Sequence, residues 1–225
     1  MQCFYLKARF AVFRTFSSGS FRPTAGFITH SAAYGLLLNF AGIEIRHDDG
    51  KLPMTLIKKN IPKVKIALGA LAFPMRHSIF QQLHNYPVGN TGKAHAFDTK
   101  GNKYNIVPAN RELLSDIRAY ICIDGNDLEK WVQQGINGKR PRKYGLPFLG
   151  DNNFLIDRFE SVSHREPAHW YSKVDQNQEC AVENTTRLTT TIDRLELSRT
   201  ISYLFAPIQN KIVDPPKEAW VDIPS

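Results

Sequence analysis

The side chains in this chain that could do chemistry are basic residues interleaved with aromatic and amide residues, in segments 14–30, 76–103 and 139–143. Cations bind phosphates, and aromatic rings stack on the splayed bases of single strands, so this mixture predicts RNA binding. We expect the following residues to bind RNA: Arg14, Arg22, Thr24, His30, Ser31, Arg76, His77, His84, Lys93, His95, Lys139, Arg140, Arg142, Lys143, Gly145 and Gly150.

The first of these segments is a loop that leads into a predicted helix. Backbone amides and the positive end of a helix favour a phosphate at that position. The planar guanidinium of Arg22 could hold a phosphate with two hydrogen bonds. The rings of Phe16, Phe21 and Phe27 could stack on bases. The alternative is that these rings belong to the core and that Arg22 is a solvated loop residue, and the loop alone does not decide between the two.

The second and third segments are predicted loops of a different kind. Segment 76–103 belongs to an insertion of nearly 40 residues, and loops of that length in compact domains are usually functional or disordered. The run 139–143 reads KRPRK and leads directly into YGLPFLG at 144–150. Glycine allows another backbone to approach closely, so Gly145 and Gly150 could admit a nucleic-acid backbone. A solvated basic surface is the alternative for this run.

Enzyme signatures are absent from the sequence. It contains no G-x-S-x-G, H-E-x-x-H, Walker or dinucleotide-binding motif. The seven histidines do not show metal-ligand spacing, so we expect no metal, and no other cofactor. A metal-independent ribonuclease remains the alternative, with these candidate groups: Tyr34, His30, His77, His84 and His95.

Hydrophobic periodicity predicts the elements that position these segments. Phe4, Leu6 and Ala8 alternate with Tyr5 and Lys7, which is a strand pattern and not that of an amphipathic targeting helix. We expect strands over 3–14, 64–73, 117–123 and 154–162, helices over 32–43 and 126–138, a protruding hairpin over 74–112, and further strands over 187–197 and 200–205. The order is β-α-β, insertion, β-α-β. It predicts an α+β, ferredoxin-like or RRM-like domain over 1–162, with a mostly β C-terminal extension of the same domain over 163–225.

Charge and cysteine content narrow the possible partners. The net charge is +8, and residues 1–120 contain 16 lysines and arginines against 6 aspartates and glutamates. This excess favours a polyanionic partner, with a simple solubility charge as the alternative. Cys3, Cys122 and Cys180 show neither zinc spacing nor a disulfide framework, so we expect free thiols in a reducing cytoplasm. The longest apolar run is too short to span a bilayer, so we expect no membrane.

Five short motifs, in order, resemble a known family. They are ARFAVFR at 8–14, FRPT at 21–24, HSAAYGLL at 30–37, NRELLSD at 110–116 and LPFLG at 146–150. Together they resemble the CRISPR-associated RAMP superfamily, and within it the Cas-five subfamily. The resemblance covers about residues 3–160.

The resemblance implies a function and partners. It implies a thumb hairpin over about 76–110 and a non-catalytic role in a prokaryotic type I Cascade complex. There the chain would cap the 5′ handle of the guide crRNA and contact the neighbouring backbone and large subunits, with target DNA engaged indirectly. Some members process precursor RNA with a Tyr/Lys/His group. No one set of residues here aligns with that group, but Tyr34, His77, His84 and several lysines keep this alternative open. A generic single-stranded RNA-binding module is the third possibility.

Overall fold

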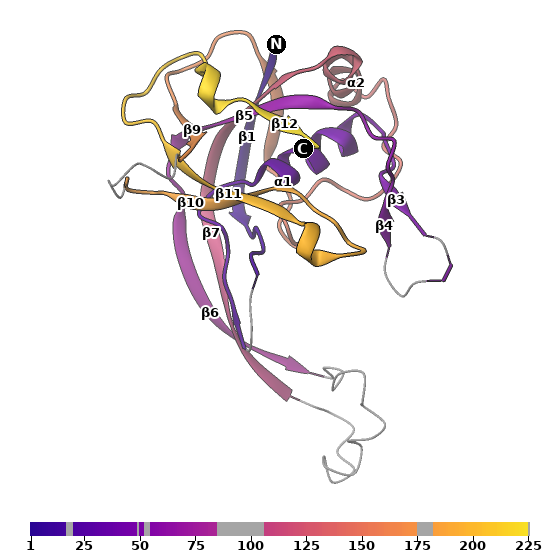
Figure 1. Cartoon of the computed structure of the whole chain (residues 1–225), viewed down its shortest axis with the longest axis vertical. Helices are drawn as coiled ribbons and strands as arrows, with labels where there is room; N and C mark the ends of the chain where they lie inside the picture. Colours follow the sequence, from indigo (N-terminus) through magenta and orange to yellow (C-terminus); the bar gives the residue numbers. More distant parts are fainter. Residues whose placement is uncertain (17–19, 49, 52–54, 85–105, 175–181, 225) are drawn as a thin grey trace.

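In the part of the chain that the structure describes, one large sheet runs through the molecule, and two α-helices pack against it (Figure 1). The computed structural model describes residues 1–16, 20–48, 50–51, 55–84, 106–174 and 182–224. The helices are α1 (His30–Phe40) and α2 (Asn126–Ile136). Among the described residues, ten strands form the sheet, and all of its strand pairs but one, that of β2 and β7, are antiparallel. The protein is therefore of mixed α and β class, as expected.

The centre of the sheet contains the four strands predicted from the sequence. They are β1 (Gln2–Ala11), β5 (Val64–Ala72), β7 (Ile106–Asp124) and β8 (Arg158–Val162). They lie in the order β5-β7-β1-β8, all antiparallel to their neighbours. Helix α1 lies between β1 and β5 in the chain, and α2 lies between β7 and β8. The predicted order of strands and helices is thus present.

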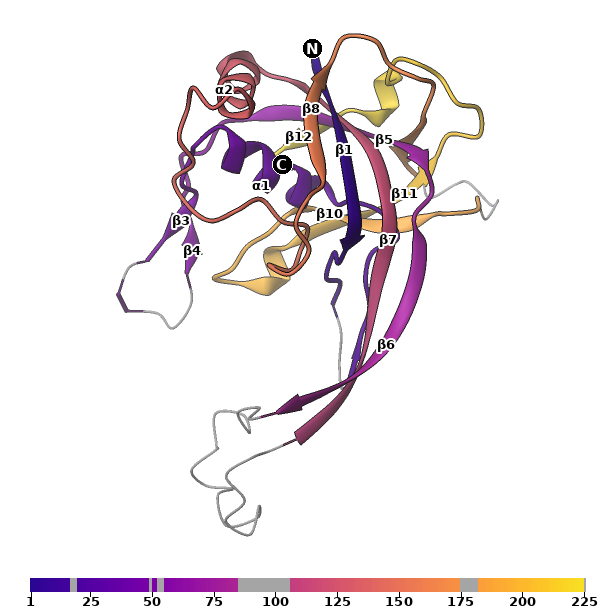
Figure 2. The same ribbon diagram turned by 180° about the vertical axis from the view of Figure 1, so that it is seen from behind.

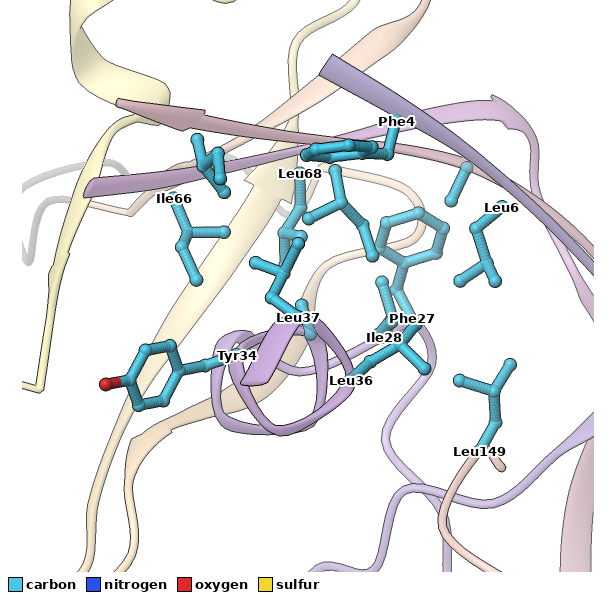
Figure 3. Close-up of a cluster of buried hydrophobic side chains, with 14 of the residues drawn as sticks. Phe4, Leu6, Phe27, Ile28, Tyr34, Leu36, Leu37, Ile66, Leu68 and Leu149 are labelled. Atoms are coloured by element: carbon cyan, nitrogen blue, oxygen red, sulfur yellow. The ribbon is translucent and has the colours of Figure 1, made fainter. Parts of the chain in front are cut away.

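The main core lies between the sheet and the helices. Phe4 and Leu6 of β1 and Leu68 of β5 are fully buried there and face Leu37 of α1 (Figure 3). The alternation seen in the sequence from Phe4 to Ala8 follows from this, because every second side chain of this stretch points into the core and its neighbours point away. The pattern shifts at the end of β1, where Phe10 is exposed and Ala11 is buried. Helix α1 starts at His30, two residues before the predicted start, because Thr29 caps it: the Thr29 hydroxyl accepts one of the free N–H groups of the first turn, that of Ala32, at 3.2 Å.

A long hairpin protrudes from the body of the protein (Figures 1 and 2). Its arms are β6 (Met75–His84) and the first half of β7, paired from Met75–Ser115 to His84–Ile106. The predicted hairpin is confirmed for these arms, and its tip, 85–105, lies outside the described residues. The predicted start of the third strand at 117 was wrong. Strand β7 begins at Ile106 because one continuous strand serves both the sheet and the hairpin.

The remaining strands extend the sheet or form small additions. They are β2 (Phe21–Arg22), β3 (Arg46–His47), β4 (Leu56–Ile57), β9 (His169–Lys173), β10 (Thr186–Thr191), β11 (Ile201–Pro207) and β12 (Val221–Ile223). β2 pairs in parallel with β7, and β3 pairs with β4. β9 and β12 pair with β5, and β11 and β10 continue the sheet beyond β9. The C-terminal residues therefore share the sheet of the N-terminal half. The described C-terminal residues also contain two short 3-10 helices, Leu197–Arg199 and Lys217–Ala219.

The expectation of free cysteines was wrong. Cys3 and Cys122 form a disulfide, although 119 positions separate them in the sequence. They lie directly opposite each other on β1 and β7, on the face of the sheet that points away from the helices. Sequence spacing cannot show this pair, because the register of two distant strands creates it. Cys180 lies outside the described residues.

Candidate nucleic-acid interface

Four arginines gather where the hairpin leaves the sheet. Strand β2 places Arg22 directly beside Arg111 of β7. Arg14 bridges to Thr24 through the backbone, and Arg76 lies on β6. We call Arg14, Arg22, Arg76 and Arg111 the thumb-base cluster. Two predicted segments, the loop 14–30 and the start of 76–103, therefore meet at one place.

Two carboxylates hold this cluster together. Arg76 pairs with Glu112 at 3.2 Å, and the same carboxylate accepts the backbone N–H of Thr24 at 3.0 Å. Arg111 pairs with Asp151, which follows the glycine loop, and both side chains are largely buried. The Asn153 backbone N–H and Arg111 hold the pKa of the Asp151 carboxyl below its usual range, so it remains ionised. These two carboxylates thus join the strands and loops that carry the cluster, and a group of side chains made mainly of cations attracts an anionic partner.

Exposed aromatic rings lie beside the thumb-base cluster. Phe21 of β2 and Phe80 of β6 are both in register with Asn110 of β7, so the three residues share one row across the hairpin. Phe21 is 46% exposed and Phe80 63% exposed. Arg76 and Glu112 share this face of the hairpin, whereas Arg22 and Arg111, each one position along its strand, point to the other face. Exposed rings are suited to base stacking. The sequence motifs did not single out Phe80 or Arg111 as binding residues, and strand pairing reveals both.

The basic run forms a separate site, which we call the basic groove. It is an open depression of about 590 Å³, lined by Gly135, Gly138, Arg140, Pro141, Arg142, Lys143, Tyr144, Gly145 and Leu146. Arg142 and Lys143 are exposed, and Gly145 has a positive φ of 22°. Lys139 is exposed but does not line the groove. The structure therefore brings four of the predicted residues together here: Arg140, Arg142, Lys143 and Gly145.

The groove is anchored to both helices. The Arg140 Nε donates to the backbone oxygen of Ala41, and its guanidinium lies 4.9 Å from the ring centroid of Trp131. Asn39 of α1 donates to the backbone oxygen of Tyr144 at 3.1 Å. The guanidinium carbon of Arg46 lies 4.6 Å from the centroid of the Tyr144 ring, so Arg46 also belongs to this site. Its position in the sequence, far from the basic run, gave no sign of this. Arg140 is thus mainly a tether, which leaves Arg142 and Lys143 as the cations that face outward from the groove.

Two predicted RNA contacts, Thr24 and His30, were wrong. The Thr24 side chain is 3% exposed, and its hydroxyl accepts the N–H of Phe13 at 2.8 Å. His30 is fully buried against Phe205, with ring centroids 4.7 Å apart. Burial, and then the charge of Lys173, lower the pKa of His30 to about 3, so the ring is neutral at physiological pH. Both residues support the fold.

The prediction for Gly150 also needs correction. Its φ is +79°, and a side-chain Cβ there would lie 1.4 Å from the backbone oxygen of Val12. The backbone that approaches this glycine therefore belongs to the protein itself, and Val12 donates its N–H to Leu149 at 3.0 Å beside it. Gly150 seats the loop on the residue that follows β1, and it is not needed for an approaching nucleic acid.

The remaining predicted residues are distributed differently. Ser31 is half-buried, with its hydroxyl 3.1 Å from that of Thr29. His77 lies in an open groove of about 740 Å³ on the hairpin, with its Nε2 2.6 Å from the Ser115 hydroxyl. The His84 side chain, Lys93 and His95 lie outside the described residues.

The described residues contain neither a metal-ligand cluster nor a membrane-spanning helix. Within this part of the chain, no group of three or more histidine, cysteine, aspartate or glutamate side chains could hold a metal ion. Nor does any of the helices described have the length and apolar content needed to cross a membrane.

Comparison with known proteins gives a match of fold. No protein-family model matches the chain, and no curated protein matches its sequence. A solved structure described as "CRISPR RNA-guided surveillance complex" is similar over 97% of this chain and 95% of its own, with a TM-score of 0.58 and 11% identity. One described as "Crystal structure of Cas protein" is similar over 96% and 99%, with a TM-score of 0.51 and 11% identity. This chain therefore has the fold of two CRISPR-associated structures over almost its whole length.

Proposed function

We propose that this chain is a non-enzymatic RNA-binding subunit of a CRISPR surveillance complex, and that it caps the 5′ handle of the guide RNA. The observation that carries the proposal is the thumb-base cluster, where arginines from three distant segments come together at the base of the hairpin, on strands that also carry two exposed phenylalanine rings. The fold likeness to a CRISPR RNA-guided surveillance complex supports the kind of assembly. The ordered sequence motifs support the Cas-five subfamily.

We also propose that the core is ferredoxin-like. The order β5-β7-β1-β8, with α1 after β1 and α2 after β7, supports this, because a split β-α-β arrangement gives it. The hairpin of β6 and β7 would then be an insertion between the two halves, equivalent to a thumb. The hairpin protrudes from the body of the protein, which supports contacts with a neighbouring backbone subunit, and the large subunit and target DNA would lie further along the same assembly.

The first prediction concerns the thumb-base cluster. We expect Arg14→Gln/Arg22→Gln/Arg76→Gln to weaken binding of a labelled guide RNA by roughly 10- to 100-fold at 0.1 M salt. The log-log salt slope should become shallower by about 2, because each phosphate contact on a single strand contributes about 0.7. Fluorescence anisotropy over a salt series measures both values, with a guide that carries its repeat-derived 5′ end and one that lacks it.

A matched control separates a site from total charge. Arg187→Gln/Arg199→Gln/Lys217→Gln removes the same charge from exposed C-terminal positions. If both triple variants lose the same affinity for the guide RNA, the effect comes from total charge and the cluster is not a specific binding site. Equal affinity for the two guides would favour the generic single-stranded RNA-binding module.

The second prediction concerns catalysis, because a ribonuclease is the competing function. His77 is the described histidine that favours it, since it shares an open groove with Arg9 and contacts the Ser115 hydroxyl. Metal-independent cleavage needs a base and an acid or cation at one phosphate. Tyr34 does not fit the role of the acid. Its side chain is buried, its hydroxyl donates to the backbone oxygen of Pro62, and burial raises its pKa far above the usual value.

We therefore expect no specific cleavage of CRISPR repeat RNA by the purified protein. Labelled repeat RNA, incubated with and without chelator and resolved on a denaturing gel, tests this. Cutting at the handle boundary that disappears in His77→Ala but persists in Ser115→Ala would establish the ribonuclease function instead.

A further inference from the structure

A second surface, on the face of the sheet away from the helices, carries features that the thumb-base cluster does not explain. Strands β7, β1 and β8 lie side by side there (Figure 2). An open pocket of about 410 Å³ lies over them, within the size range of ligand sites. We call it the outer-face pocket, and it is lined by Tyr5, Leu71, Ala72, Arg118, Tyr120, Arg158, Glu160, Val162 and Glu166.

Three cations form one row across this face. Lys7 of β1 is in register with Arg118 of β7 on one side and with Arg158 of β8 on the other. Residues directly opposite each other share a face of the sheet, and like charges placed so are destabilising. All three side chains are exposed. A row of this kind gains stability when an anion lies on it.

The carboxylates nearby relieve this row only in part. Arg118 pairs with Asp116 at 3.0 Å and Arg158 with Glu160 at 2.7 Å, and all four side chains are substantially exposed. Exposed pairs of this kind contribute little and exchange readily with another anion. Among the described residues, no carboxylate lies within 4 Å of Lys7, the middle cation.

The floor of the pocket is aromatic. Tyr5 of β1 is in register with Tyr120 of β7, and their ring centroids are 6.2 Å apart. Tyr120 is buried and fixed, because it stacks near Trp170 and its hydroxyl accepts the N–H of Glu166 at 3.1 Å. Tyr5 is the more accessible ring, and Arg158 lies 5.8 Å from its centroid.

We propose that the outer-face pocket binds one nucleotide of a single-stranded nucleic acid, with its base on Tyr5 and its phosphate on Lys7, Arg118 and Arg158. The row of cations lies next to a row that holds Tyr120, Tyr5 and Glu160, since Glu160 is in register with Tyr5. A ring flanked by cations and a carboxylate suits a nucleotide, because carboxylates accept the amino groups of bases. A simple anion would not use Glu160 and Glu166. Lys7 lies outside the pocket lining and Arg9 follows it on β1, so the cations continue along a strand.

The test uses labelled RNA and DNA 20-mers of one sequence, and it rests on the proposed RNA-binding function. We expect Tyr5→Leu to weaken binding of at least one strand by about 5- to 150-fold, and Tyr5→Phe to leave it unchanged, because only the first loses stacking. Whichever of the two 20-mers binds more weakly to Tyr5→Leu, RNA or DNA, is the nucleic acid that the pocket takes. Lys7→Gln/Arg118→Gln/Arg158→Gln should lower the salt slope by about 2. Lys58→Gln/Lys59→Gln/Lys130→Gln is the matched control, since these lysines are exposed outside the sheet.

Cross-linking the wild-type protein to a 4-thiouridine-substituted RNA, or a 4-thiothymidine-substituted DNA, avoids any folding defect of a variant. We expect a cross-link in a peptide that contains Tyr5. Normal binding by Tyr5→Leu together with no cross-link at Tyr5 would overturn the inference, while intact binding through the thumb-base cluster would leave the proposed function standing. If the wild-type protein binds neither the RNA nor the DNA 20-mer, the outer-face pocket and the proposed RNA-binding function are both wrong.

Discussion

Replacing Gly150 with alanine is expected to lower the free energy of unfolding by about 3 kcal/mol or more. Two effects add. A left-handed φ of +79° strains any residue with a side chain, which costs about 1–3 kcal/mol. The new Cβ would also lie 1.4 Å from the Val12 backbone oxygen, and relief of such a clash requires the loop to move away from the chain at Val12, at a similar cost.

The chain contains a matched control for this change. Gly138 has a φ of +70°, but a Cβ at this position would have no neighbour within 4 Å, so Gly138→Ala carries the backbone strain alone. We expect a loss of about 1 kcal/mol there. Urea denaturation of the two variants measures the difference. If Gly150→Ala is no worse than Gly138→Ala, the close approach to Val12 does not hold the loop in place.

Loss of the Cys3–Cys122 disulfide is expected to lower the free energy of unfolding by about 2–4 kcal/mol. The bond joins residues 119 positions apart, and a cross-link that closes a long loop restricts the unfolded chain strongly. Both residues are buried, at 1% and 0% exposure, so the reduced thiols would remain in place in the folded protein. Thermal or urea denaturation of the wild-type protein with and without reductant measures the effect.

The double variant Cys3→Ala/Cys122→Ala is the control for that experiment. Its stability should match that of the reduced protein to within the small cost of two lost sulfur atoms, and reductant should leave it unchanged. A wild-type protein whose stability does not respond to reductant, and whose two thiols react with a labelling agent after unfolding without reductant, would show that the bond does not form in solution.

Local pattern alone predicted the central elements well. The alternation around Leu6 and the apolar face of α1 at Leu37 follow from the periods of a strand and a helix that each bury one side. The same reasoning placed the hairpin arms and the basic run at 139–143, because turn residues and charge are also properties of short segments. These features need no knowledge of which strand lies beside which.

Pairing between distant segments decided the rest. Arg22 lies beside Arg111, Cys3 opposite Cys122, and Lys7 between two arginines only because of strand register, which no short stretch of sequence encodes. Burial likewise separated His30, which lies in the core, from His77, which lies in an open groove, although both are histidines in basic surroundings. By itself the sequence determined the elements and the kinds of side chain available. The tertiary structure decided which of them share a surface, because a surface is assembled from strands that meet only after folding.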